Sequence, residues 1–197
     1  MAGVLVVDRY EGYHRSPCAR QYCYAHLLRD VEDLEKEFPQ QPEIQRFVSA
    51  LAPWLARAMH LRGLKLSRAQ FRQQAAQTRA AIEAVPRAPA QHPAIQKIQN
   101  LFREKADRLY HWTRDRVIPA DNNRAERELR PLVIARKVSF GSQSEAGART
   151  REVLMSVRHT LRKRTDHVTA AFQRALDRLA QNGKINLYKR LFRCGSY

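Results

Sequence analysis

Two short apolar runs near the start of the chain limit the folds that it can adopt. Residues Gly3 to Val7 read Gly-Val-Leu-Val-Val and end at Asp8. Such a run is typical of a strand buried on both faces of a largely parallel sheet. A second run, Gln21 to Ala25, predicts another strand and leads into a helical pattern that ends near Phe38. Strand, short connection, strand and helix together predict the beginning of an α/β fold.

From Pro39 to about Val117 the pattern is helical only. Apolar residues recur at helical spacing from Ile44 to Met59, with Pro53 expected to kink or split that helix. Ser67 and Gln70 form a capping-box pattern that opens a second helix, and a third runs from about Ile95 to Trp112. The block therefore predicts a large all-helical insertion.

The last third of the chain predicts an irregular stretch followed by helices. Residues 132–140 are expected to be extended or irregular, and Gly141 with Ser142 predicts a turn. Apolar residues at helical spacing then predict one helix from Thr150 to Leu161 and another from Val168 to Leu179.

The charge balance indicates a polyanionic partner. The chain has 36 Lys and Arg against 19 Asp and Glu, a net charge of +17, and nucleic acid is the commonest partner of such a surface. No apolar run approaches the roughly 20 residues that span a bilayer. The first residues lack the basic flank of a signal peptide. We therefore expect a cytosolic protein with no membrane partner.

The cysteines argue against a disulfide framework because their number, three, is odd. Cys18, Cys23 and His26 have ligand types that suit zinc, but no second Cys/His pair at a matching spacing completes the four ligands of a structural site. The favoured interpretation is that Cys23 and His26 pack and form hydrogen bonds.

Carboxylates are concentrated where two patterns end. Asp8 closes the first strand, and ligand crevices in open α/β sheets lie beyond the carboxyl ends of the strands. A metal ligand and a loop residue that caps the next turn are both compatible with this position. Glu126 likewise has two readings, a site carboxylate or the partner of Asn123 in a helix cap. Asp121 and Asn122 either satisfy backbone donors or surround a metal.

Basic residues surround these carboxylates. Residues 121–164 contain eleven Lys and Arg against five Asp and Glu. Although a solvated face is the usual role of such charge runs, phosphate contact is the preferred interpretation here.

Several motifs resemble the insertion-sequence-66 family of bacterial DDE transposases. The carboxyl-terminal signature is matched by Asp-Asn-Asn-x-Ala-Glu-Arg-x-Leu-Arg-Pro, residues 121–131, and by Arg-Lys-x-x-Phe-Gly-Ser-x-x-x-x-Gly-Ala, residues 136–148. The second-aspartate strand resembles residues 6–13, and the Cys-x-Ala-His-x-x-Arg box resembles residues 23–29. Four matches in the family's order make the resemblance specific.

The resemblance implies an RNase H-like core that cuts and joins DNA with divalent metal. Asp8 and Glu126 would then be catalytic, metal-holding acids, with Mg²⁺ as the natural ion. Asp121, Asn122 and Asn123 would form an outer shell. DNA phosphates would be contacted by Arg124, Arg127, Arg130, Arg136, Lys137, Arg149 and Arg158.

One departure from the family pattern limits this expectation. The family's first catalytic aspartate lies on an earlier strand, and only Met-Ala-Gly precedes the second-aspartate strand here. Asp30 and Asp33 are poor substitutes because both fall in a predicted helix. We therefore expect a mostly helical α/β protein with a truncated RNase H-like core that retains two strands.

This expectation divides the chain into four parts. Residues 1–38 form the partial core, 39–117 the helical insertion, 118–164 the last-acid helix and basic segment, and 165–197 a carboxyl-terminal helix and tail. We expect a nucleoid-associated, transposase-like protein of DNA transposition that is inactive alone and is either a homo-oligomer or completed by another transposase polypeptide. The alternative is a non-enzymatic, basic DNA-binding protein derived from a transposase.

Overall fold

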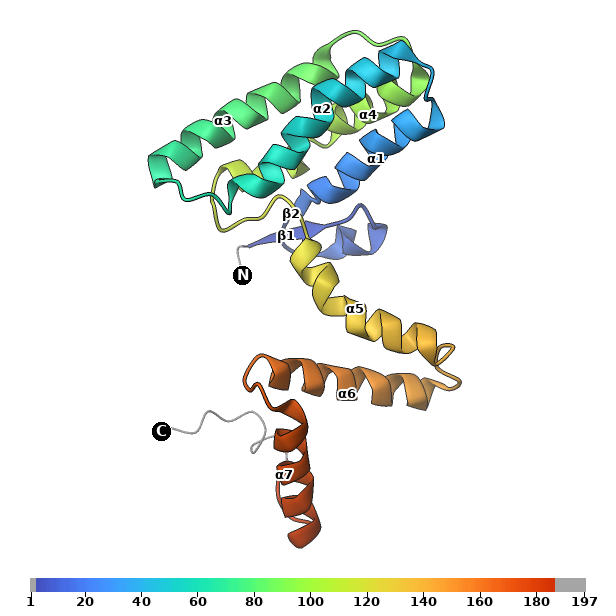
Figure 1. Ribbon diagram of the computed structural model, residues 1–197, viewed down its shortest axis with the longest axis vertical. Coiled ribbons are helices and arrows are strands. Elements are labelled where there is room, and N and C mark those ends of the chain that lie inside the picture. The colour runs from blue at the N-terminus through green and yellow to red at the C-terminus, as the bar shows by residue number, and fades with distance from the viewer. Residues whose placement is uncertain (1–2, 187–197) are drawn as a thin grey trace. The chain divides into compact units, whose positions relative to one another are not determined.

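The computed structural model describes residues 3–186 and divides the chain into two compact units, residues 1–128 and 129–197. The described residues are mostly helical and contain one small parallel sheet (Figure 1). None of their helices is long and apolar enough to span a bilayer. An α/β, mostly helical chain is therefore confirmed, whereas a truncated RNase H-like core and the four-part division stay predictions.

The sheet consists of β1 (Val4–Val7) and β2 (Ala19–Tyr22), which pair in parallel from Val4 opposite Ala19 to Val7 opposite Tyr22. A single 3-10 turn, Glu11–Arg15, lies in the connection between them. The expectation that the first strand is buried on both faces is wrong for the described residues, since Val7 is buried but Leu5 is 36% exposed. Within residues 3–186 only β2 flanks this strand, so its other edge is unpaired.

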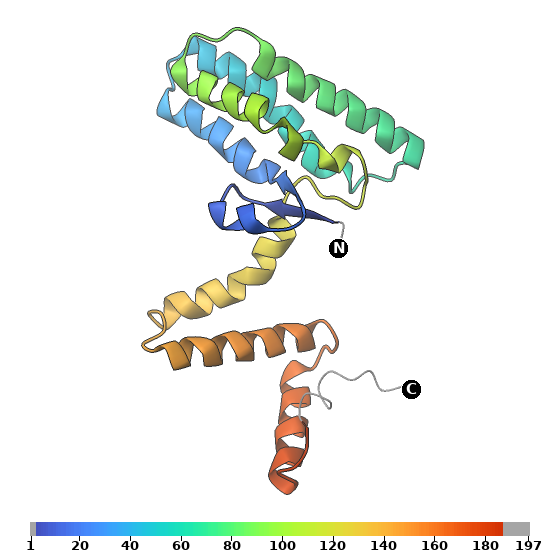
Figure 2. The ribbon, with the colours of Figure 1, turned by 180° about the vertical axis from the view of Figure 1, so that it is seen from behind.

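Four helices follow the sheet and form a bundle: α1 (Tyr24–Glu37), α2 (Pro42–Leu61), α3 (Arg68–Ala84) and α4 (Pro93–Glu104). Figures 1 and 2 show them side by side, with the sheet at one end of the bundle. α1 packs on α2 and α2 packs on α3 through fully buried residues such as Leu51 and Leu55. The helical insertion therefore supplies most of the hydrophobic core of the first unit.

Of the features predicted for the helical insertion, some are confirmed and others differ in the structure. The capping box at the start of α3 is confirmed, because the Ser67 hydroxyl accepts from the Gln70 N–H at 3.2 Å and the Ser67 N–H donates to the Gln70 side chain at 2.9 Å. Pro53 lies inside α2 without dividing it. The predicted third helix is shorter than expected, since α4 ends at Glu104 and 3-10 turns follow at Ala106–Arg108 and His111–Thr113.

A buried glutamine joins β2 to those 3-10 turns. The Gln21 side chain is fully buried, and its amide nitrogen donates to the carbonyls of Tyr22 and Leu109, each at 2.9 Å. Its amide oxygen accepts from the N–H groups of His111 at 2.8 Å and Trp112 at 3.3 Å. We name Gln21 with these contacts the Gln21 junction. It satisfies a buried amide completely, which a buried polar group requires.

The Tyr24 side chain reinforces the Gln21 junction. Its hydroxyl donates to the Leu109 carbonyl at 2.7 Å, and its ring meets Trp112 edge to face, with the two centroids 5.8 Å apart. Burial raises the pKa of Tyr24 well above its usual value, so the phenol stays a neutral donor. The last part of the helical insertion is therefore held beside the end of β2 and the start of α1.

Arg116 secures the end of α2 after the insertion closes. Its guanidinium donates to the carbonyls of Arg62 at 3.0 Å, Leu66 at 2.8 Å and Leu64, and it lies 5.7 Å from the centre of the Phe71 ring. The last carbonyls of a helix lack partners within the helix. From a segment about fifty residues later in the chain, Arg116 satisfies the carbonyl of Arg62, the residue that caps α2, and two carbonyls of the connection between α2 and α3.

α5 (Asn123–Val138) begins in the first unit and ends in the second, where α6 (Glu145–Arg162) and α7 (Val168–Gln181) follow. The expectation of an irregular segment at 132–140 is wrong up to Val138, because the helix continues past Pro131. Good helix formers such as Leu132, Ala135, Arg136 and Lys137 favour this continuation. The predicted turn is present, and Gly141 has a φ of 93°.

The second unit buries few side chains. Among residues 129–186 only Leu161 of α6 and Ala175 of α7 are buried. The same range leaves eight large apolar side chains exposed: Leu129, Val133, Ile134, Val138, Phe140, Val153, Leu154 and Leu176. Its hydrophobic core is therefore thin compared with that of the first unit.

Replacement of Gln21 by alanine is predicted to destabilise the first unit. The change removes the side-chain bonds to three backbone groups of residues 109–112 and leaves the His111 and Trp112 N–H groups without those bonds. This loss should lower the free energy of unfolding by about 2–4 kcal/mol. Urea denaturation followed by tryptophan fluorescence measures this, since Trp54 and Trp112 both lie in the first unit. The matched control is Gln77→Ala on the exposed face of α3, which should change stability by less than about 0.5 kcal/mol. Equal effects of the two substitutions would contradict this role of Gln21.

Candidate active site

Three segments that are distant in the sequence meet at the carboxyl end of the two strands. Asp8 directly follows β1, and the Val7 carbonyl accepts from the Cys23 N–H at 2.8 Å. The next amide, that of Tyr24, donates to the Ala120 carbonyl at 2.8 Å. Residues 120–126 are therefore held beside the end of the sheet, which is the edge where open α/β sheets bind ligands.

Cys23 lies at the centre of this meeting point. Its side chain is 1% exposed, and its sulfur accepts from the Asn122 N–H at 3.4 Å. Burial raises the pKa of the Cys23 thiol, although hydrogen bonds from nearby backbone N–H groups oppose that effect. A neutral, buried thiol behaves as a small packing group, which agrees with the packing role expected from the sequence.

Asp121 shapes the start of α5. Its carboxylate accepts from the Asn123 N–H at 3.0 Å, and the Glu126 N–H donates to the Asn122 carbonyl at 3.1 Å. The helix begins at Asn123 itself. The Asn123 N–H, which the Glu126 side chain was expected to cap, is already bonded to the Asp121 carboxylate. An outer-shell role for Asp121, Asn122 and Asn123 stays a prediction.

The Glu126 carboxylate faces α1. One of its oxygens lies 3.6 Å from Nε2 of His26, while Nδ1 of His26 is buried without a partner in the described residues. The Asn122 side-chain oxygen is likewise buried and unpartnered. Buried polar atoms without partners are rare in folded proteins. They mark this edge of the sheet as a polar region that the described residues leave incompletely satisfied.

Asp8 is half-buried and begins a turn. One carboxylate oxygen accepts from the Tyr10 N–H at 3.1 Å, which is the local contact expected of a loop aspartate. That contact uses one oxygen, and Oδ2 has no hydrogen bond within residues 3–186. The two interpretations of Asp8, a residue that caps the turn and a metal ligand, are therefore compatible with the same conformation.

The donors around Asp8 and Glu126 do not make a complete metal site. Across the described part of the chain, no group of three or more His, Cys, Asp or Glu side chains is arranged to hold a metal ion. Asp30 is paired with Arg9, and Asp33 lies 2.7 Å from the Lys36 ammonium. Both ion pairs support the expectation that neither aspartate substitutes for a missing acid.

The predicted phosphate-binding residues of α5 are exposed but do not share one face. The exposed members are Arg124, Arg127, Arg130, Arg136 and Lys137. With about 3.6 residues per turn, Arg127, Arg130 and Lys137 lie within a quarter turn of one another, and Arg136 lies about half a turn from Arg127. We name Arg127, Arg130 and Lys137 the α5 basic face.

The basic residues of α6 also lie on more than one face of their helix. Arg158 shares a face with Arg162, while Arg149 lies about half a turn from Arg158. Arg151 is on the same side as Arg158 and donates to the Ser139 hydroxyl at 2.6 Å. Helical spacing therefore separates residues that a simple count of charges groups together.

Sequence reasoning missed Phe140 as an exposed residue. Its side chain is 91% exposed and its φ is 53°, an uncommon conformation for a bulky residue. The Gly141 N–H donates to the Arg136 carbonyl at 2.8 Å and closes the turn that presents this ring. The signal was present in the Phe-Gly-Ser motif, where a glycine with positive φ ends the helix.

Comparison with known proteins adds one finding. Searches of curated proteins and of solved structures each gave no match. A family model described as Transposase IS66 family matches residues 1–150, or 150 of the 197 residues. This range includes Asp8, the Cys23–His26 segment and Glu126, which are the parts of the chain that meet at the end of the sheet. The chain therefore belongs to the IS66 family of transposases.

Proposed function

We propose that this protein acts in DNA transposition and that the end of the β1–β2 sheet is part of its catalytic centre. One observation carries the proposal: the strand followed by Asp8, the Cys23–His26 segment and the helix that bears Glu126 meet at one edge through backbone hydrogen bonds and the His26–Glu126 contact. The site lies in the cytoplasm, at the bacterial nucleoid where the DNA substrate is.

Asp8 and Glu126 are two of the acids of this centre in our proposal. They come from separate elements, as the carboxylates of a divalent-metal site do. Mg²⁺ suits their oxygen ligands, and His26 would orient Glu126 from outside the ligand set. Since the described residues supply no third donor in place, the remaining ligand comes from outside them.

We further propose that another transposase polypeptide or a second copy completes the core. The unpaired edge of β1 supports this, because an exposed strand edge offers backbone groups to another strand. On this account the chain alone does not cut DNA.

A second candidate function is non-enzymatic DNA binding. It is favoured by the incomplete donor set at the sheet and by the exposed cations of α5 and α6. Phosphate contacts alone give binding that depends strongly on salt and little on sequence. The two functions share the basic surface and differ in whether Asp8 and Glu126 bind metal.

The α5 basic face is predicted to bind DNA phosphates. Replacing Arg127 and Arg130 with alanine should weaken binding of a short duplex and reduce the slope of log affinity against log salt by about 1.8, since each phosphate contact contributes about 0.9. Fluorescence anisotropy over a salt series measures both quantities. The matched control is Arg68→Ala with Arg72→Ala, two exposed arginines of α3. If both pairs change the slope equally, net charge and not the α5 face determines binding.

Metal binding is predicted to depend on both acids. Asp8→Asn and Glu126→Gln should each weaken Mn²⁺ binding by the full chain by at least about tenfold. Water-proton relaxation measures Mn²⁺ binding directly and does not require catalysis. Glu104→Gln, on the exposed end of α4, is the control and should bind Mn²⁺ as the unaltered chain does. Equal affinity in all four proteins would reject the catalytic-centre proposal and leave the DNA-binding candidate.

A further inference from the structure

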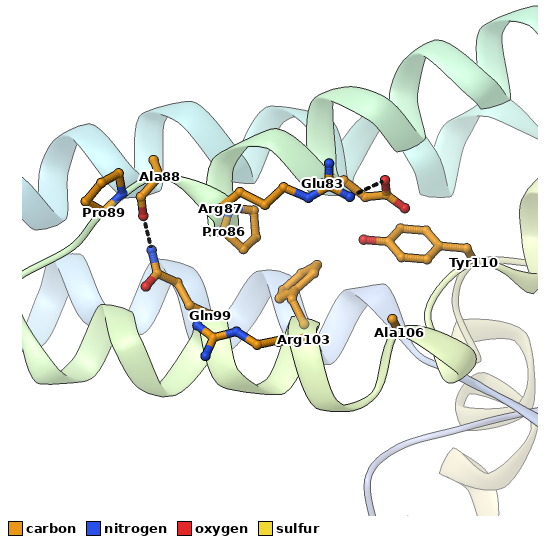
Figure 3. A pocket seen from close by; sticks show the side chains of 10 residues that line it. Glu83, Pro86, Arg87, Ala88, Pro89, Gln99, Arg103, Ala106 and Tyr110 are labelled. Carbon is orange, nitrogen blue, oxygen red and sulfur yellow. Dashed lines mark hydrogen bonds and ion pairs between the residues drawn. The ribbon is translucent and has the colours of Figure 1, made fainter.

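A cavity of about 510 Å³ lies within the helical insertion. Its walls come from the end of α3 with the 3-10 turn Val85–Arg87, from α4, and from Tyr110 (Figure 3). This volume falls in the range of small-molecule pockets. No residue of the candidate active site lines it.

Flat apolar surfaces form part of the lining. The side chains of Pro86, Pro89 and Phe102 all face the cavity. Pro86 and Phe102 are both buried, so packing fixes their positions. Rigid, flat apolar walls suit an aromatic ring, which gains by stacking.

Tyr110 supplies a polar group that the fold does not use. The residue is 6% exposed, and Figure 3 shows its hydroxyl directed into the cavity near Glu83. Within the described residues this hydroxyl has no hydrogen bond, whereas the Tyr24 hydroxyl is fully engaged. The Arg79 guanidinium lies 4.6 Å from the Tyr110 ring centre and holds the ring in place. Burial raises the pKa of Tyr110, so its phenol remains protonated and can donate.

The charges at the cavity favour an anion. Glu83 is neutralised by Arg79 at 2.7 Å and by Arg87 at 3.2 Å. Arg103 also lines the cavity, and nothing in residues 3–186 forms an ion pair with it. Arginine is well suited to phosphate because its guanidinium presents several donors in a planar fork.

We propose that this cavity binds the base of an unpaired nucleotide in a DNA strand, with the adjoining phosphate on Arg103. A nucleotide combines the features that the cavity matches: a flat ring for the proline and phenylalanine walls, a hydrogen-bonding edge for Tyr110, and an anion for the guanidinium. This inference rests on the proposed function, because it takes DNA as the partner of the whole chain.

The test compares three short duplexes that differ at one position. The first is fully paired, the second has one extra unpaired adenine, and the third has an abasic spacer in place of that adenine. The unaltered chain should bind the unpaired-base duplex on the order of tenfold more tightly than the abasic duplex, because only the former offers a base to stack. Fluorescence anisotropy measures the three affinities.

Two substitutions assign this preference to the cavity. Tyr110→Phe keeps the ring and removes only the unused hydroxyl, so the fold is retained and the preference should fall about fivefold. Arg103→Ala should weaken binding of the unpaired-base duplex, while Arg68→Ala, the charge-matched control on α3, should preserve the preference. Circular dichroism checks that each variant is folded.

The possible results separate this inference from the proposed function. If the chain shows no preference for the unpaired base, or if Tyr110→Phe keeps the full preference, the cavity proposal is overturned. The proposed DNA function still stands in that case, provided that the paired duplex is bound. If dAMP alone binds in a Tyr110-dependent way and the unpaired base gives no preference, the cavity is a free-nucleotide site and the strand proposal is overturned. Absence of binding to all three duplexes overturns both.

Discussion

The Gln21 junction is the contact on which the rest of the first unit depends. One fully buried amide side chain binds three backbone groups of residues 109–112, which lie about ninety residues later in the chain. It closes the helical insertion and brings residues 118–126 back beside the start of α1, where the Ala120 carbonyl accepts from the Tyr24 N–H. Loop closure over such a length is entropically unfavourable. The junction and the apolar core around Trp112 offset that cost together.

The position of Glu126 follows from this closure. Cys23 and Tyr24 anchor Asn122 and Ala120, so α5 starts at the end of the sheet and not elsewhere on the bundle. The side chain of Glu126 then faces His26, in the first turn of α1. The range that matches the family model contains all three segments that meet at this edge. No group of three or more possible metal donors is present among the described residues.

The sequence predicted those features that depend on neighbouring residues. The capping box of Ser67 and Gln70, the all-helical character of residues 39–117 and the turn at Gly141 all follow from local spacing and were found as expected. Contacts between distant segments could not be predicted in this way: nothing near Gln21 indicates a partner at Leu109, and nothing near His26 indicates Glu126. Pro131 misled the local reading, because a proline within α5 does not end that helix.

The two units have different physical characters. The first has an extended apolar core built on α1 to α4, whereas residues 129–186 bury only two side chains and expose both cations and apolar groups. Exposed apolar groups of this size are typical of surfaces that bind a partner. The first unit is therefore organised around a core, whereas residues 129–186 of the second consist mostly of exposed surface.

Amide hydrogen exchange of the full chain, followed by NMR at individual residues, tests the central claim most directly. We expect the Cys23, Tyr24 and Asn122 amides to be protected and Gln21→Ala to speed their exchange together, since they depend on closure at residues 109–112. Amides inside α2 and α3 should be affected less. If these three amides exchange as freely as exposed loop amides in the unaltered chain, or remain equally protected in Gln21→Ala, the Gln21 junction does not hold the candidate active site together.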